Sequence, residues 1–318
     1  MTNAAATERW VLLSGGVGGA KLALGLDRVL PAGTLTVIAN TGDDFRHLGL
    51  AISPDIDTLL YTLADRVNPD SGWGRRDESW QFMTALTALG GEDWFRLGDR
   101  DLAVHIERTR RLAAGDTLTA VTRDLATRWG IGSVILPMSD APSPTRVITR
   151  DGSLAFQDYF VRQRAEPIVS GFDYGGAAPS PAVLAALSAS GLRGILIAPS
   201  NPWLSIEPLL AMGGLRAALV AARVPIVAVS PIVGGDAIKG PTAKIMRELG
   251  IAVTSASIAR HYRGLGNGIV LDERDRHEMP LIESLGLHAQ CTGTVMRTLD
   301  DKTALAQATL AFARTLAP

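Results

Sequence analysis

The chain has 318 residues, 47% of them hydrophobic, and its 31 lysines and arginines nearly balance 32 acidic residues, for a formal net charge of −1. This size and hydrophobic content allow a sizeable core, in one large domain or in a core with an insert. The balanced charge and the lack of a Lys/Arg run argue against a nucleic-acid-binding protein. The single cysteine, Cys291, excludes an internal disulfide framework and a thiolate metal cluster.

The first ten residues, MTNAAATERW, have no charged segment followed by a long apolar one, so we expect no signal peptide. No segment offers roughly 18 uninterrupted apolar residues, so we expect no membrane-spanning helix. A cytoplasmic protein that does not contact membranes is the resulting expectation.

Short apolar runs followed by loops and amphipathic helices recur along the chain. We predict strands at Trp10–Ser14, Thr34–Ala39, Gly194–Ala198 and Pro225–Ser230, and a helix at Gly18–Leu30. The apolar runs are continuous rather than alternating, as in strands that are buried on both faces. The pattern predicts an α/β fold: a Rossmann-like, doubly wound, mainly parallel sheet with helices on both faces.

The middle of the chain is more charged and follows a different pattern. A helix with a narrow apolar stripe is predicted at Asp99–Ala114, and strand-like pieces at Thr145–Thr149 and Ala155–Val161. We therefore predict a core and an α+β insert covering the mouth of the sheet. The core is assigned residues 1–65 and 183–318, and the insert residues 66–182.

A glycine-rich segment, GGVGGAK at Gly15–Lys21, follows the first strand and opens the first helix; we call it the glycine turn. Glycines let the backbone approach a phosphate, and a helix N-terminus offers free N–H groups. The dinucleotide fingerprint is incomplete, because Asn40 stands where an acid is expected, and the segment lacks the Gly-Lys-Ser/Thr of a P-loop. Two interpretations stay open: a tight turn that needs positive φ, or a phosphate site formed by Gly15, Gly16, Gly18 and Gly19.

Four aspartates crowd the next segment, from Asn40 to Thr58. Ser53 fits a helix N-cap and Pro54 the first helical position, which places Asp55 and Asp57 in the first turn, off the apolar face. Acids there complement the helix dipole by under about 1 kcal/mol each.

The helix dipole does not explain Asp43 and Asp44, which lie in the preceding loop. Gathered carboxylates repel one another, and Mg²⁺ with oxygen ligands would compensate their charge and bridge to phosphates. Metal or substrate binding is therefore predicted for Asp43 above all, and for Asp44, Asp55 and Asp57.

Two later loops are predicted at the carboxyl ends of strands, where open α/β sheets bind ligands. One contains Ser200 and Asn201. The other runs from Ser230 to Lys244 and contains Gly234, Gly235, Lys239 and Lys244, whose lysines are either phosphate partners or solvated surface residues.

Further polar features stay ambiguous. Arg75 and Arg76 stand between two tryptophans and would clamp a phosphate, stack on a ring system or belong to a surface loop. The segment from Gly98 to Asp101 would cap a helix or line the cleft. The five histidines, His105 among them, show no zinc-ligand spacing, so structural or surface roles are expected.

Ten segments in register resemble the 2-phospho-L-lactate transferase family of coenzyme F-420 biosynthesis, and they span most of the chain from Ser14 to about Asp300. They are SGGVGGAK, NTGDD, SPDIDT with Tyr61, GWGRRDE, LGDRDLA with His105, ILPMSD, FQDYFV, PSNPWLSI, VAVSPIVGG with AIKGPTAK, and ARHY.

The resemblance implies a reaction. The family takes a three-carbon phosphoacid joined to guanosine by a diphosphate and transfers its phosphoester part to the ribityl hydroxyl of the deazaflavin Fo. GMP leaves, and Mg²⁺ is required. The resemblance also implies a homodimer.

The resemblance implies roles for individual residues as well. Asp43 and Asp57 would be catalytic, and Asp43, Asp55 and Asp57 would be metal ligands. Lys21 departs from some relatives and receives no catalytic role. The substrates would be held by the residues Gly15, Gly16, Gly18, Gly19, Asp44, Arg75, Arg76, Ser200, Asn201, Gly234, Gly235 and Lys239.

Two alternatives belong to other functional classes. Nucleotide-sugar-binding regulators of the gluconeogenesis-factor type resemble the same core without catalysis. Their DDGGS-type stretch is missing here, where GDDFRHLG and SPDIDT stand instead. An NAD-dependent oxidoreductase is disfavoured by Asn40 and the incomplete fingerprint.

Overall fold

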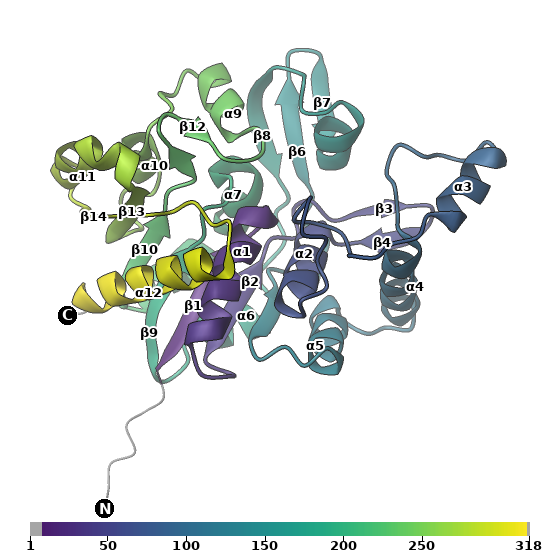
Figure 1. The fold of residues 1–318 in the computed structure, drawn as a ribbon, viewed down its shortest axis with the longest axis horizontal. Helices are drawn as coiled ribbons and strands as arrows, with labels where there is room; N and C mark the ends of the chain where they lie inside the picture. Colours follow the sequence, from purple (N-terminus) through teal and green to yellow (C-terminus); the bar gives the residue numbers. More distant parts are fainter. Residues whose placement is uncertain (1–7, 317–318) are drawn as a thin grey trace, which may run out of the picture.

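The computed structural model describes residues 8–316, and a seven-stranded sheet runs through its centre (Figure 1). The strand order is β14-β13-β10-β9-β1-β2-β5, and all six neighbouring pairs are parallel. The strands are β1 (Arg9–Ser14), β2 (Leu35–Ala39), β5 (Val134–Pro137), β9 (Leu192–Ile197), β10 (Ile226–Val229), β13 (Gly268–Asp272) and β14 (His288–Thr292). The four predicted strands are present, with ends shifted by one or two residues.

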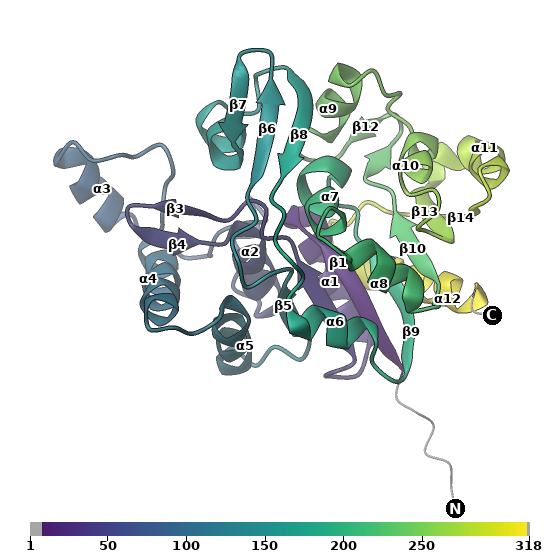
Figure 2. The same cartoon turned by 180° about the vertical axis from the view of Figure 1, so that it is seen from behind.

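Helices cover both faces of this sheet (Figures 1 and 2), which confirms the doubly wound α/β prediction. Trp10 and Leu12 of β1 face one core, whereas Val11 and Leu13 face the other. The first core includes α1 (Gly16–Val29), α2 (Pro54–Leu63), α5 (Leu118–Arg128) and α12 (Leu299–Thr315). The second includes α6 (Pro181–Leu187), α7 (Glu207–Leu210), α8 (Leu215–Ala221), α9 (Thr242–Glu248), α10 (Ser255–His261) and α11 (Met279–Ser284).

The range assigned to the insert, 66–182, differs from the structure in one respect. It contains β5, which pairs in parallel with β2 and forms an edge of the central sheet. The sequence analysis predicted no strand at Val134–Pro137, because a four-residue apolar run is too short to reveal its partner. The division into core and insert otherwise stays a prediction.

The rest of that range forms smaller elements. A three-stranded antiparallel sheet has the order β7-β6-β8, and α3 stands out at the side of the molecule beyond α4 (Figure 1). A strand was predicted at Ala155–Val161. In the structure, β7 ends at Ala155, and a π-helix begins at Asp158. The elements are α3 (Gln81–Ala88), α4 (Asp99–Ala113), β6 (Thr145–Thr149), β7 (Gly152–Ala155), β8 (Val169–Tyr174) and a π-helix (Asp158–Arg162).

Short elements complete the structure. Two hairpins pair β3 with β4 and β11 with β12. Their bounds, with those of a second π-helix and a 3₁₀-helix, are β3 (Phe45–His47), β4 (Leu50–Ile52), β11 (Ile232–Val233), β12 (Asp236–Ala237), the π-helix (Pro202–Ile206) and the 3₁₀-helix (Glu273–Glu278).

Within residues 8–316, no single helix is both long and apolar enough to cross a bilayer. Two successive helical segments, Pro202–Leu210 and Leu215–Ala221, have the length and composition of a membrane span only when taken together, and they are bent by 79° relative to each other. The expectation that the chain has no signal peptide rests mainly on residues 1–7, which lie outside the described residues.

Helices α1 and α12 pack closely enough to require a glycine (Figure 1). A Cβ atom on Gly25 would lie 2.1 Å from the backbone oxygen of Lys302 and 3.2 Å from the Cβ of Ala306. Because a backbone oxygen cannot turn aside as a side chain can, any larger residue would push the two helices apart.

We expect Gly25→Ala to lower the free energy of unfolding by about 1–3 kcal/mol, the usual cost of overfilling a packed site. Urea denaturation would measure the loss. Gly213→Ala is the matched control, because a Cβ there meets no atom within 4 Å and the variant should unfold at the wild-type urea concentration. Equal stability of Gly25→Ala would show that the contact relaxes without cost.

Candidate functional site

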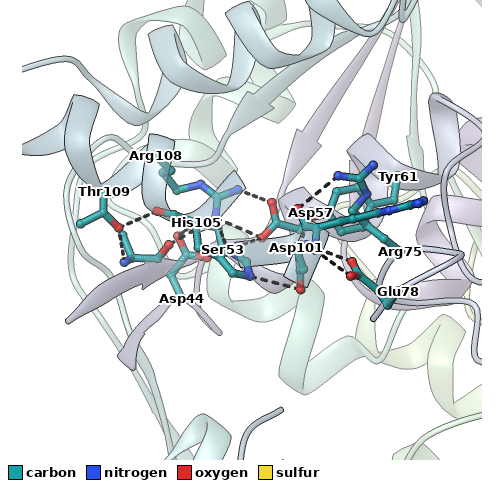
Figure 3. Close-up of polar contacts among 12 residues, drawn as sticks. Asp44, Ser53, Asp57, Tyr61, Arg75, Glu78, Asp101, His105, Arg108 and Thr109 are labelled. Atoms are coloured by element: carbon teal, nitrogen blue, oxygen red, sulfur yellow. Dashed lines mark hydrogen bonds and ion pairs between the residues drawn. The ribbon is translucent and has the colours of Figure 1, made fainter. Parts of the chain in front are cut away.

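Two adjoining polar clusters lie beyond the carboxyl ends of β1 and β2. The first, which we call the acidic cluster, consists of Asp43, Asp44 and Asp55. The second, which we call the ion-pair network, consists of Asp57, Tyr61, Asp101, His105 and Arg108 and joins α2 to α4 (Figure 3). Asp55 and Asp57, both in the first turn of α2, therefore belong to different clusters.

In the acidic cluster, Asp55 is held at the N-terminus of α1. Its Oδ1 accepts the N–H of Gly16 at 2.6 Å, and its Oδ2 accepts the side-chain N–H of Asn40 at 2.9 Å. The same Asn40 amide lies 3.5 Å from Asp43 Oδ1, and its own oxygen accepts the N–H of Gly42 at 2.8 Å. Asn40 is fully buried and lies between a carboxylate of a loop, Asp43, and a carboxylate of a helix, Asp55, which contacts the glycine turn.

Burial makes the charged forms of these carboxylates costly. It raises the pKa of Asp43 well above its ordinary value, and the charges of Asp55 and Asp44 raise it further. Burial also raises the pKa of Asp44, although the hydroxyl of Ser53, which donates to Asp44 Oδ2 at 2.8 Å, acts in the opposite direction. Burial raises the pKa of Asp55 to about 6 despite its bonds from Asn40 and Gly16.

The structure corrects two expectations about this segment. Asp55 and Asp57 were placed off the buried face of α2, but they are only 7% and 4% exposed. The apolar spacing identified the face that packs on the sheet, and it could not show that α1 and α4 cover the other sides. Ser53 stands at the N-cap, but its hydroxyl donates to Asp44 instead of accepting a backbone N–H.

Arg108 anchors the ion-pair network. Only 1% exposed, it donates from Nη1 to Asp57 Oδ2 at 3.0 Å and from Nη2 to Asp57 Oδ1. It also lies 3.3 Å from His105 Nδ1. Because a guanidinium can only donate, Nδ1 acts as acceptor, and the proton on Nε2 faces Asp101 Oδ2 at 3.2 Å.

The far end of this network orders the start of α4. The hydroxyl of Tyr61 donates to Asp101 Oδ1, and Glu78 accepts the backbone N–H groups of Arg100 at 2.7 Å and Asp101 at 2.9 Å. Burial alone would raise the pKa of Asp101, but the hydrogen bonds from His105 and Tyr61 and the charge of Arg108 lower it, and that pKa ends below its ordinary value. Asp101 is therefore held as a carboxylate between two donors.

Asp57, Asp101 and His105 also meet one geometric condition for a metal site, since one ligand atom from each lies within 4.8 Å of the others. Arg108, however, already contacts both oxygens of Asp57. A guanidinium thus already neutralises the carboxylate of Asp57.

The glycine turn lies beside the acidic cluster and packs against the loop after β9. A Cβ on Gly15 would lie 2.6 Å from Asp55 Oδ2, and one on Gly19 would lie 2.3 Å from Ser14 Oγ. Ser200 Oγ donates to the Gly15 carbonyl at 2.6 Å and accepts the Gly15 N–H at 3.2 Å. Close approach of chain segments therefore explains these glycines, and a positive φ of 65° explains Gly16.

Asn201 and Gly234, two further predicted site residues, have hydrogen-bond partners of their own. Asn201 Oδ1 accepts the N–H groups of Trp203 and Leu204, and its Nδ2 is buried without a partner in the described chain. The N–H of Gly234 donates to the buried Asp275 carboxylate, with both oxygens at 3.0 Å.

Each of the two arginines of the GWGRRDESW segment has a defined environment. Arg75 lies over the rings of Tyr61 and Trp129 and donates to the Arg100 carbonyl at 3.2 Å. Arg76 forms an exposed ion pair with Asp65 at 2.9 Å. Arg75 is thus adjacent to the ion-pair network, whereas Arg76 points to a surface carboxylate.

Sequence reasoning missed Asn40, Arg108 and the position of His105. Asn40 was interpreted only as the residue that stands where the dinucleotide fingerprint has an acid, and Arg108 only as part of a helix with a narrow apolar stripe. One signal was available for α4: Asp101, His105 and Arg108 recur at spacings of four and three residues, which puts them on one helix face.

This fold and site describe an α/β enzyme whose buried carboxylates lie beside a glycine turn. A model of the family described as 2-phospho-L-lactate transferase CofD matches residues 10–285. The chain therefore belongs to this family, and it is a transferase.

Curated relatives match this chain over nearly their whole length. A phosphoenolpyruvate transferase from Streptomyces avermitilis is 41% identical over 96% of this chain and 98% of the relative. A 2-phospho-L-lactate transferase from Methanosarcina mazei is 40% identical over 93% of this chain and 98% of the relative. Family and names together support a phosphoacid transferase in coenzyme F-420 biosynthesis.

Among solved structures, a member of the upf0052 family from Bacillus halodurans aligns with a TM-score of 0.64. It covers 96% of this chain and 99% of that one at 14% identity. Likeness at this level of identity shows that the two chains share a fold.

We expect Arg108→Met to destabilise the protein by about 3–5 kcal/mol, because Asp57 would keep a buried charge without its main partner. Thermal unfolding would show a lower midpoint for this variant. Arg110→Met, on the same helix but 65% exposed, should change the midpoint little. Equal midpoints for both variants would contradict the assigned role of Arg108.

A pH dependence follows from Asp55, whose pKa rises from its ordinary 3.8 to about 6 in the folded protein. The folded state then binds a proton more tightly than the unfolded chain. The resulting stabilisation is complete below about pH 4 and is lost as the pH rises through about 6. In metal-free buffer, Asp55→Asn should flatten this part of the stability profile, measured by urea unfolding between about pH 4 and pH 7. Asp173→Asn, at an exposed position, should retain the wild-type slope.

Proposed function

We propose that this transferase moves a phospho-three-carbon-acid group, phospholactyl, phosphoenolpyruvyl or phosphoglyceryl, from a guanosine-diphosphate-linked donor to the ribityl hydroxyl of Fo. The hydroxyl oxygen forms a bond to the distal phosphorus and loses its proton to solvent. The bond from that phosphorus to the bridging oxygen breaks, and the oxygen leaves with GMP. The observation that carries the proposal is the acidic cluster, held against a glycine turn at the N-terminus of a helix.

Mg²⁺ fits this site on chemical grounds. Asp43 and Asp55 are buried, the neighbouring charges that raise the pKa of Asp43 belong to carboxylates, and Asp44 Oδ1 is buried without a hydrogen-bond partner in the described chain. Hard oxygen ligands of this kind suit Mg²⁺. Asp43 and Asp55 would hold the ion, which would neutralise charge on the transferred phosphoryl group.

The protein's own groups would position the substrates. The first N–H groups of α1, beyond the one taken by Asp55, would bind the donor diphosphate. Asn40 fixes the direction of Asp55, and Ser200 fixes the backbone of Gly15, so the two groups meet the donor in a set geometry. Preorganisation of this kind is the main source of catalysis in phosphoryl transfer.

Asp57 receives a different role from the one first predicted. Its two oxygens face Arg108, so we propose that it fixes α2 against α4 and is not a metal ligand. The family match disfavours the regulator alternative, because the chain belongs to a family of transferases.

The test is incubation of the purified protein with Mg²⁺, Fo and each of the three guanylylated phosphoacids in turn. Mass-detected chromatography should show a phosphoester of Fo, with GMP in equal amount. Competition among the three donors would identify the preferred acid. Release of GMP without any Fo product would remove Fo as the acceptor.

Asp43→Asn should reduce turnover by at least a factor of about 100, the scale expected when a group that stabilises transition-state charge is lost. Its circular dichroism should match that of the wild type. Asp173→Asn is the control and should turn over normally, because this aspartate is exposed on β8. Wild-type turnover of Asp43→Asn across a Mg²⁺ titration would exclude Asp43 from the site.

A further inference from the structure

The three-stranded sheet β7-β6-β8, which we call the small sheet, has two buried polar residues at one end. Arg146 near the start of β6 pairs with Ala155 at the end of β7, so Thr145 and Gln157 lie together beyond this pair. Gln157 directly precedes the π-helix. The side chains of Thr145 and Gln157 are only 1% and 5% exposed.

This end of the small sheet holds two consecutive carbonyls of the loop from Asn40 to Asp44, which we call the Asp43 loop. The N–H of Thr145 donates to the Gly42 carbonyl at 2.7 Å, and the side-chain amide of Gln157 donates to the Asp43 carbonyl at 3.1 Å. These carbonyls belong to the peptide groups on either side of the Asp43 Cα. Because each peptide group is planar, holding both restricts the backbone rotations of Asp43 and thereby the direction of its side chain.

Close packing keeps the Asp43 loop against these donors. A Cβ on Gly42 would lie 2.4 Å from Thr145 Oγ1 and 2.9 Å from the Cβ of Pro208 in α7. The N–H of Gly42 also donates to Asn40 Oδ1 at 2.8 Å. The loop is thus packed between β6 and α7, where the two donors of the small sheet can set its position.

Gln157 is itself held by the segment that follows it. Tyr159, two residues further on, is fully buried in the core that also contains Val147 of β6. A neutral amide suits the position next to the acidic cluster, because it donates a hydrogen bond without adding charge. A carboxylate there could not donate, and it would add a further negative charge to three buried acids.

We propose that Gln157 is a positioning residue, which fixes the Asp43 carboxylate beside Asn40 and Asp55 by holding the backbone of Asp43. The small sheet thereby takes part in the site although Gln157 lies 114 residues from Asp43 in the sequence. The inference rests on the function proposed above in one respect: if Asp43 holds Mg²⁺, Gln157 sets the affinity for the ion. The positioning itself is measurable without metal, substrate or turnover.

Hydrogen exchange of the full chain in metal-free buffer, followed by mass spectrometry, tests the positioning. Gln157→Met roughly keeps the length of the side chain but removes its donor. The N–H groups of Gly42 and Asp44, which are hydrogen-bonded within the loop, should then exchange at least about fivefold faster than in the wild type. The N–H of Gly16, which donates to Asp55, is the internal reference and should keep its rate.

Two further variants control this measurement. Gln163→Met makes the same substitution at an exposed position six residues away and should match the wild type at all of these N–H groups. Gln157→Asn keeps the amide but shortens the side chain by one methylene group, so it should also speed exchange in the Asp43 loop. Wild-type exchange there in both Gln157 variants would overturn the proposal, and so would an equal acceleration at Gly16, which would show a general loss of stability.

Calorimetric titration with Mg²⁺ adds a measurement that a purely structural residue would not change. The Kd for Mg²⁺ should rise at least about fivefold in Gln157→Met and stay within about twofold of the wild type in Gln163→Met. Wild-type affinity of Gln157→Met would overturn the positioning role. A wild type that binds no Mg²⁺ would instead contradict the metal proposed above, and the exchange rates would then decide the role of Gln157.

Discussion

The buried carboxylate of Asp55 at the N-terminus of α1 is the interaction on which the rest of the site depends. It accepts a backbone N–H from Gly16 and a side-chain N–H from Asn40, so it joins the first two βα units of the sheet. The close approach explains why Gly15 has no room for a Cβ. It also places a carboxylate at a helix N-terminus, which attracts anions, and the proposed binding of a cation beside a phosphate rests on this arrangement.

The two clusters divide the chemistry of the first turn of α2. Asp55 faces the glycine turn and has a raised pKa, whereas Asp57 faces Arg108 on α4. A buried pair of this kind contributes modestly to net stability, but removing one partner is costly. The network therefore fixes where α4 sits relative to α2, and with it one wall of the site, while the acidic cluster retains the charge that a metal would neutralise.

Much of the fold followed from local pattern. Continuous apolar runs predicted four strands of the parallel sheet, and β1 sends alternate residues into the two cores as a doubly wound sheet requires. The pattern failed at β5 and at Ala155–Val161, where short segments gave no periodicity to measure. For the site, the sequence brought Asp43 and Asp55 together correctly, but it did not reveal Asn40 as the residue that orients them.

By itself the sequence determined the α/β class, the glycine turn, the crowding of four aspartates and the resemblance to a transferase family, because these depend on residue types at short spacing. Only the tertiary structure decided which partners those residues meet. Arg108 lies 51 residues from Asp57, and Lys239 lies 168 residues from the carbonyl that it contacts. Contacts at such separations depend on how helices pack on the sheet, so no local pattern could distinguish the aspartate paired with arginine from the one left beside the glycine turn.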